Sequence, residues 1–129
     1  RLERTATGAL KLTSDGSVYG FLTLATLSRT PPVTESGSNT HTVAVTTTSL
    51  ICDRGATVTV TLPTASSFPG RELYIKTIQA FTVVYNASNV VPSTSATAGT
   101  AILPATDGAW AFLVSDGTNW VIMAANPLV

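Results

Sequence analysis

The chain has 129 residues, enough for one domain built on one core, and its formal net charge at pH 7 is zero. Only 11% of its residues are charged, so bulk electrostatics offers no attraction to nucleic acid or to an anionic membrane surface. No apolar run approaches the roughly 18 residues that a membrane-spanning helix needs, and the single cysteine, Cys52, excludes an internal disulfide.

The N-terminal segment, residues 1–39, is predicted to be a connector that precedes the main domain. Charges alternate at its start, residues 9–13 alternate apolar and polar side chains, and residues 18–27 are mostly apolar. We expect these stretches to form a hairpin or shaft-like strands, followed by a loop over residues 29–39 that contains two prolines and a glycine. The chain begins with Arg1 rather than Met, so we expect it to be a piece of a longer chain.

Short strands separated by turn residues are predicted from residue 40 onward. Residues 57–62 show the clearest alternation, which places Val58, Val60 and Leu62 inward and three threonines outward. The next residue is a proline, which ends the strand because it has no N–H for the ladder. Further strands are predicted within residues 40–52, 71–78, 81–85, 90–91 and 100–103, and a hairpin within residues 110–124.

The strand pattern favours an all-β fold. The sequence contains no amphipathic helix of three turns, while turn signals recur about every 8–12 residues. We therefore predict an antiparallel β-sandwich or jelly-roll-like domain over residues 40–129, with residues 1–39 as an additional hairpin or shaft-like part.

The turn of the predicted C-terminal hairpin lies at Asp116-Gly117, between two apolar runs. This dipeptide favours a type I′ turn, which needs φ > 0 at both central residues. A two-residue loop places Ser115 opposite Thr118, whereas a four-residue loop places Ser115 opposite Trp120. Both registers divide the side chains between the two faces of the hairpin in the same way.

Both faces of this hairpin are apolar, whereas a hairpin on a domain surface normally shows water one polar face. One face carries Ala111, Leu113, Trp120 and Ile122, and the other carries Trp110, Phe112, Val114, Val121 and Met123. A second sheet would cover one face, and a second copy of the chain is a candidate for covering the other. The predicted subunit interface draws on Trp110, Phe112, Val114, Trp120 and Met123.

The residues that could carry chemistry form no recognisable catalytic or metal-binding pattern. The only histidine, His41, has no Gly-x-Ser-x-Gly elbow to serve, and Cys52 has no sequence signature of a nucleophile. Three of the seven carboxylates precede glycine, where turn chemistry explains them. The spacing of a metal site is absent. We therefore expect no enzymatic activity, no metal and no cofactor.

Ligand contacts, if the domain binds one, are expected on loops, because loops on a rigid scaffold are where binding residues concentrate. The loops over residues 30–40 and 64–70 are the candidates. The side chains predicted to contact a receptor are Arg29, Glu35, Phe68 and Arg71.

Three stretches of the chain, taken in order, resemble a domain that recurs in bacteriophage fibres, tailspikes and other virion appendages. They are Thr-Val-Thr-Val-Thr-Leu-Pro at residues 57–63, Leu-Tyr-Ile-Lys at residues 73–76 and Leu-Val-Ser-Asp-Gly-Thr-Asn-Trp at residues 113–120. The last stretch is the most specific, and the resemblance covers about residues 42–124. It implies an all-β, C-terminal, homotrimeric domain that serves attachment or trimer assembly and has no shared catalytic residues.

The resemblance also implies partners and a location. The chain would contact copies of itself, other virion proteins and a glycan on the host cell surface, and it would enter the virion surface after assembly in the host cytoplasm. The alternative is a carbohydrate-binding domain that works as a monomer and stacks exposed aromatic side chains on sugar rings. The two hypotheses differ in where the apolar surface goes, into a subunit interface or into a ligand groove.

Overall fold

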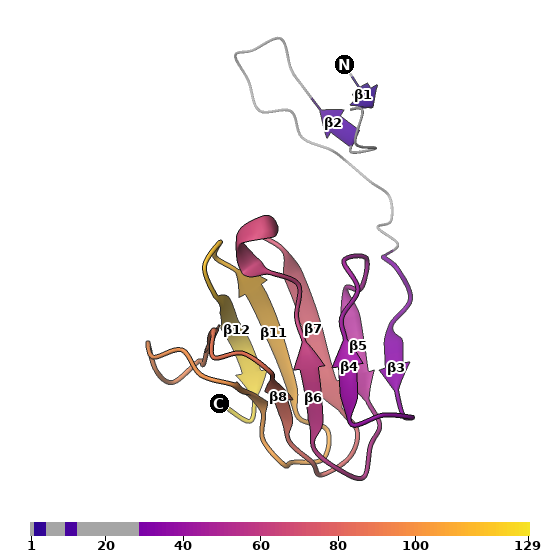
Figure 1. The fold of residues 1–129 in the computed structure, drawn as a ribbon, viewed down its shortest axis with the longest axis vertical. Helices are drawn as coiled ribbons and strands as arrows, with labels where there is room; N and C mark the ends of the chain where they lie inside the picture. Colours follow the sequence, from indigo (N-terminus) through magenta and orange to yellow (C-terminus); the bar gives the residue numbers. More distant parts are fainter. Residues whose placement is uncertain (1, 5–9, 13–28) are drawn as a thin grey trace.

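The computed structural model describes residues 2–4, 10–12 and 29–129, and this part of the chain is all-β (Figure 1). Strands β1 (Leu2–Arg4) and β2 (Leu10–Leu12) pair antiparallel with each other. The strand predicted within residues 18–27 lies outside the described residues. One short 3-10 turn, η1 (Ala65–Ser67), interrupts the strands, and no helix of the described part is long and apolar enough to cross a membrane.

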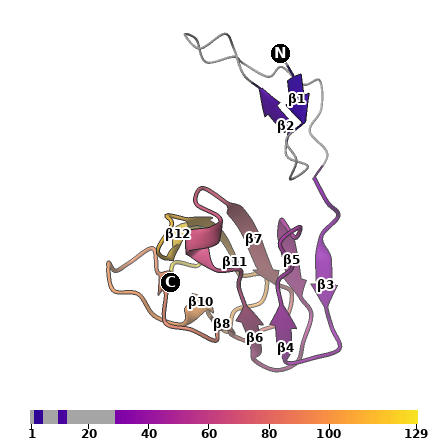
Figure 2. The same cartoon turned by 45° about the horizontal axis from the view of Figure 1, so that its top comes forward.

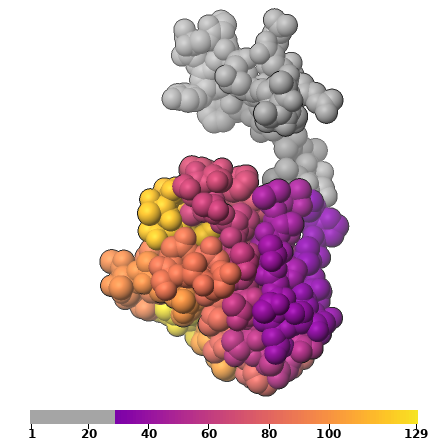
Figure 3. Space-filling model, in the orientation of Figure 1, coloured from indigo at the N-terminus to yellow at the C-terminus, as the bar shows by residue number. Residues whose placement is uncertain are grey.

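The other ten strands form two sheets that face one another (Figures 1 and 2). The smaller sheet has four strands, in the order β10 (Ala101–Leu103), β8 (Val83–Tyr85), β6 (Val58–Thr61) and β4 (Thr40–Thr42). The larger has six, in the order β3 (Val33–Glu35), β5 (Ser49–Cys52), β7 (Glu72–Thr77), β11 (Trp110–Ser115), β12 (Trp120–Asn126) and β9 (Val90–Val91). The space-filling view shows the orange segment between β8 and β10 standing out at one side (Figure 3).

The chain crosses from one sheet to the other after every strand from β3 to β10, whereas β11 and β12 are neighbours in the larger sheet. From β5 to β8, each strand therefore pairs with the strand two positions earlier, which runs in the same direction, so β3-β5-β7 and β4-β6-β8 are parallel. The predicted antiparallel arrangement is wrong for these strands and holds for the pairs of β11 with β7 and β12 and of β10 with β8. Turn residues mark where the chain reverses, but they do not say which sheet the next strand joins.

The core lies between the two sheets and takes the inward side chains of both. The predicted inward residues Val58, Val60 and Leu62 are all buried there. The hairpin faces also divide as predicted, because Ala111, Leu113, Trp120 and Ile122 are buried. Other large fully buried side chains come from both sheets: Leu50, Leu73, Ile75, Ile102, Leu103, Val83 and Val90.

Trp120, predicted at the subunit interface, instead belongs to this core, and that part of the prediction is wrong. Its side chain is fully buried, and its indole Nε1 donates a hydrogen bond of 2.9 Å to the carbonyl oxygen of Pro63. Pro63 follows β6, so this bond ties the larger sheet to the end of a strand of the smaller one. A buried indole needs such a partner for its N–H, and the Pro63 carbonyl supplies it.

The predicted loop over residues 29–39 contains strand β3, so that prediction is wrong at its centre. Val33 is half-buried and packs against the core, and β3 pairs in parallel with β5. The larger sheet therefore begins before residue 40, inside the segment that was predicted to be a connector. The prolines at positions 31 and 32 lie immediately before the strand, where they remove no hydrogen bond from its ladder.

The turn after β11 has four residues, because Ser115 pairs with Trp120. Gly117 has φ of +92°, and no non-glycine residue of the described part has positive φ, so the predicted type I′ turn is wrong. The Asp116 carboxylate accepts hydrogen bonds from the backbone N–H groups of Asn119 (2.6 Å) and Thr118 (2.7 Å), which hold its pKa below the usual value. The side chain of Asp116 thus closes the turn in place of a second left-handed residue.

Replacement of Gly117 by valine is expected to lower the free energy of unfolding by about 1–3 kcal/mol. The cause is the backbone conformation, which a β-branched residue rarely adopts, and not lack of space, because an added Cβ would lie 3.7 Å from the Pro69 ring. Chemical denaturation measures the change. Gly99→Val is the matched control, since Gly99 has no positive φ and open space around its Cβ. Equal losses in the two variants would contradict the assignment of strain.

Candidate functional site

The six-stranded sheet turns a mostly apolar face away from the core, which we call the outer face. Strand pairing aligns its side chains in rows, with Trp110 beside Lys76 and Phe112 beside Tyr74. The rings of Phe112 and Tyr74 stack, with 4.6 Å between their centroids and 26° between their planes. The apolar side chains of the outer face include Ile51, Tyr74, Trp110, Phe112, Val114, Val121 and Met123.

Four of the five side chains predicted for a subunit interface lie on this outer face, namely Trp110, Phe112, Val114 and Met123. Met123 is 62% exposed because the register of β11 and β12 shifts between Phe112 and Leu113 and leaves it without an opposite residue. Tyr74, which the sequence analysis did not include, is 44% exposed on the same face. Its outward position was available from the alternation of β7, in which the residues on either side of it are buried.

A hollow of about 440 Å³ lies on the outer face beside the aromatic row. Trp110 and Tyr74 supply aromatic surface to it, Lys76 supplies a positive charge, and Pro32 closes it on the side of β3. We call it the Trp110 pocket. Aromatic rings beside a polar group are a surface on which a flat ligand could stack.

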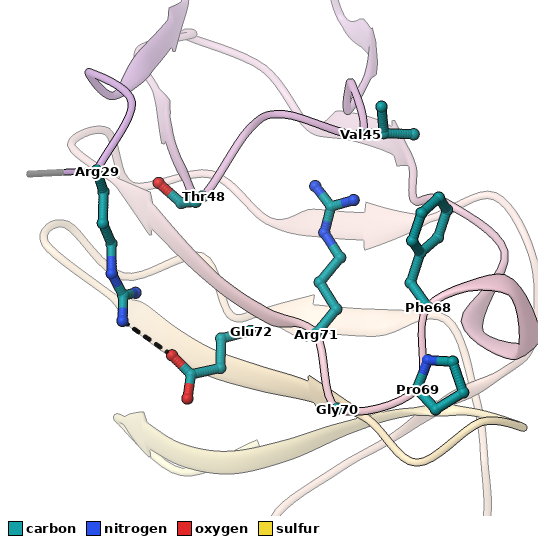
Figure 4. Close-up of a pocket in the computed structure, with 8 residues that line it drawn as sticks. All are labelled: Arg29, Val45, Thr48, Phe68, Pro69, Gly70, Arg71 and Glu72. Carbon is teal, nitrogen blue, oxygen red and sulfur yellow. Dashed lines mark hydrogen bonds and ion pairs between the residues drawn. The ribbon is translucent and has the colours of Figure 1, made fainter. Parts of the chain in front are cut away.

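A second pocket, of about 540 Å³, brings together three of the four predicted receptor contacts, Arg29, Phe68 and Arg71 (Figure 4). We call it the Arg71 pocket. Two of its remaining lining residues come from the predicted ligand loop over residues 64–70, and three come from the chain between β4 and β5 and from the start of β7, parts that sequence reasoning did not connect to the site. These residues are Val45, Thr48, Pro69, Gly70 and Glu72.

The backbone around Arg71 is held by the end of strand β11. The N–H of Gly70 donates to the carbonyl oxygen of Ser115 (2.8 Å), and the N–H of Ser115 donates to the carbonyl oxygen of Arg71 (2.9 Å). Gly70 has φ of +80°, a conformation open to glycine, which lets the chain turn from η1 into β7. Phe68, just after η1, donates its N–H to Ala65 (3.1 Å). The pocket is therefore built on ordered backbone.

The Arg71 guanidinium is held in place by neutral groups. Its Nη2 donates to the carbonyl oxygens of Thr47 (2.9 Å) and Ala44 (3.1 Å), and its central carbon lies 5.3 Å from the centroid of the Phe68 ring. Partial burial lowers the pKa of Arg71 from its usual value, yet an arginine stays charged in proteins. Across the pocket, Arg29 and Glu72 form an ion pair with 3.1 Å between Nη2 and Oε2, both side chains being nearly half exposed.

Glu35, the fourth predicted receptor contact, does not line the Arg71 pocket. It lies at the far end of β3 from Arg29, where its Oε2 is 2.8 Å from Nδ1 of His41 on β4. Its Oε1 accepts hydrogen bonds from the N–H groups of Ser38 (2.7 Å) and Gly37 (2.9 Å). Glu35 therefore joins the edge strands of the two sheets and orders the turn between them.

The remaining chemistry-bearing residues have structural surroundings. Cys52 is buried in the core, and burial raises the pKa of its thiol to about 12, so the reactive thiolate is scarce at neutral pH. Within residues 29–129 and the two short N-terminal strands, no three His, Cys, Asp or Glu side chains come together as metal ligands would.

Comparison with models of protein families finds none that matches this chain, and comparison with curated protein sequences finds no match either.

Because Glu35 is hydrogen-bonded to His41, we expect the protein to lose stability in acid. The variant Glu35→Gln should lose less stability in acid than the wild type does. The hydrogen bond from His41, followed by that from Ser38, lowers the pKa of Glu35 below its ordinary value of 4.5. The stability that Glu35 contributes is therefore complete above pH 4.5 and is lost as the pH falls through the lower pKa of the folded state. Melting temperatures at pH 7 and at about pH 3.5 measure the effect.

The melting temperature should fall further between pH 7 and about pH 3.5 in the wild-type chain than in the variant Glu35→Gln. Glu72→Gln is the matched control, because it removes a more exposed carboxylate from the Arg29 ion pair. If the melting temperature of Glu35→Gln falls as far as that of the wild type, the Glu35–His41 pair does not contribute to the acid sensitivity of the fold.

Proposed function

We propose that this chain is a non-enzymatic structural domain of a bacteriophage virion appendage, which works as a homotrimer in assembly and host attachment. The observation that carries the proposal is the outer face of the six-stranded sheet, which nothing within residues 29–129 covers. Its aromatic row and flanking aliphatic side chains are only half-buried or exposed in this part of the chain. Soluble monomers rarely leave apolar patches larger than a few hundred Å² in water.

A second copy of the same chain is the occupant that we propose for the outer face. Only 11% of the residues are charged and the net charge is zero, so little electrostatic repulsion keeps copies apart. Closed symmetry buries one repeated patch per subunit without forming filaments. Lys76 lies on the same face, where it could pair with an opposite charge of a neighbouring subunit. Physical reasoning by itself favours a dimer as the commonest case.

Three parts of the proposal rest on the resemblance of residues 42–124 to domains of phage fibres and tailspikes. They are the number of three subunits, the location in a virion and the attachment to a host. The same resemblance supports a sandwich or jelly-roll-like description of the two facing sheets. Other virion proteins and a glycan on the host surface are the further partners that we propose. The Arg71 pocket, with its mixture of charged, aromatic and hydroxyl groups, is the proposed attachment site.

The variant Phe112→Lys is expected to convert the trimer into a monomer, because it places a charge in the aromatic row that the interface would bury. Light scattering with sedimentation velocity at micromolar concentration measures the mass. Phe81→Lys is the matched control, since Phe81 is 39% exposed but lies outside the outer face, and it should leave the trimer intact. A wild-type chain that is a monodisperse monomer would overturn the proposal, and a dimer would keep the interface but reject the family inference.

A monomeric carbohydrate-binding domain is the second candidate function, and the Trp110 pocket is the observation that favours it. In that case Trp110 and Tyr74 would stack on a sugar ring instead of packing against another subunit. Oligosaccharide binding that quenches the fluorescence of Trp110 in a monomeric chain would support this candidate. Binding by a trimer whose outer face is covered would exclude the Trp110 pocket as its site.

A further inference from the structure

The Arg71 guanidinium presents donors that the protein does not use. Within the described part of the chain, its hydrogen bonds all come from Nη2, which leaves Nη1 and Nε without a protein acceptor. The two carbonyl oxygens and the Phe68 ring fix the plane of the group before any ligand arrives. The two-bond fork that arginine forms with a carboxylate includes Nη2, and both hydrogens of Nη2 are already bound to these carbonyl oxygens. The unused N–H groups of Nη1 and Nε are each suited to a single charge-assisted hydrogen bond to a carboxylate oxygen.

The opposite wall of the pocket can hydrogen-bond hydroxyl groups without repelling an anion. Glu72 offers carboxylate oxygens as acceptors, and its charge is offset by Arg29 at 3.1 Å. Thr48 adds a half-buried hydroxyl group, which can donate and accept. Two arginines and one glutamate leave the lining with a net positive charge.

The third component is apolar. Phe68, which is 36% exposed, Val45, which is 61% exposed, and Pro69 line the same pocket as the charged groups (Figure 4). A bare phosphate or sulfate ion would make no use of this surface. A sugar ring would, because its C–H groups pack on an aromatic ring while its hydroxyl groups reach polar neighbours.

We propose that the Arg71 pocket binds a carboxylated sugar unit, such as a uronic or sialic acid within a polysaccharide. The carboxylate lies on Arg71, the ring packs on Phe68, and Glu72 and Thr48 accept hydrogen bonds from ring hydroxyls. This inference rests on the proposed attachment function and specifies its ligand class. It also reduces the predicted contacts to Arg29, Phe68 and Arg71, without Glu35.

Isothermal titration calorimetry on the full chain tests the inference with trigalacturonate and sialyllactose as acidic probes. Maltotriose and lactose are their neutral counterparts, and sodium phosphate and sodium sulfate are the bare anions. We expect at least one acidic probe to bind, its neutral counterpart and both anions to bind at least tenfold more weakly, and the affinity to fall as salt is raised.

The variant Arg71→Gln should weaken the acidic probe about tenfold or more, because it removes the charged donors. Arg54→Gln is the matched control: Arg54 is also a half-buried arginine held by hydrogen bonds, to Asn39 and Ser36, but it lies outside the pocket.

Arg71 also holds the chain at Ala44 and Thr47, so Arg71→Gln could unfold locally. Phe68→Ala, at an exposed ring, is the second variant and should weaken binding while the melting temperature stays close to that of the wild type.

Four results would each overturn the inference. The first two are that no probe binds and that acidic and neutral sugars bind equally well. The other two are that phosphate or sulfate binds more tightly than the acidic sugars and that both Arg71→Gln and Phe68→Ala bind as the wild type does. Light scattering on the same samples distinguishes its failure from that of the proposed function. A trimer that binds none of the probes leaves the virion proposal standing without this ligand. A monomer that binds trigalacturonate through Arg71 keeps the ligand and removes the trimeric appendage.

Discussion

The shared core between the two sheets is the constraint on which the rest of this structure depends. The chain changes sheet after every strand from β3 to β10, so strands that are neighbours in sequence seldom pair with each other. Their common contact is the layer of inward side chains between the sheets. Trp120 is fully buried in this layer and is hydrogen-bonded to Pro63 beyond the end of β6. A strand of three or four residues is stable here because its burial is cooperative with that of its neighbours.

The same winding explains why the candidate sites combine distant parts of the chain. Each crossing between the sheets leaves a loop at one end of the molecule, and successive loops at that end lie side by side. Val45 and Thr48, between β4 and β5, thus meet Phe68 and Arg71, between β6 and β7. Arg29 joins them from the segment before β3, which the parallel pairing with β5 brings alongside. The Arg71 pocket is a product of the strand order.

Several charged side chains within residues 29–129 form ion pairs or hydrogen bonds with protein groups close to them. Glu35 bonds His41 across the two sheets, Arg29 pairs with Glu72, and Asp116 closes a turn through backbone N–H groups. These arrangements leave the outer face of the larger sheet with little charge and much aromatic surface. The Arg71 pocket is charged and the Trp110 pocket on the outer face is largely apolar, and the two have no lining residue in common. This separation is consistent with the two roles that we propose, attachment for the first and assembly for the outer face.

The sequence by itself determined which side chains of a strand point inward, because alternation in a pleated strand is a local property of period two. It correctly divided the hairpin faces, buried Val58 and Val60, and put a left-handed glycine at position 117. Only the tertiary structure decided which sheet each strand joins, that residues 33–35 form a strand, and that Trp120 faces the core instead of a partner. Those outcomes depend on pairing between residues far apart in the chain, which is selected by burial of the common core and carries no local signal. The meeting of Arg29, Phe68 and Arg71, and the departure of Glu35 to His41, follow from that same pairing.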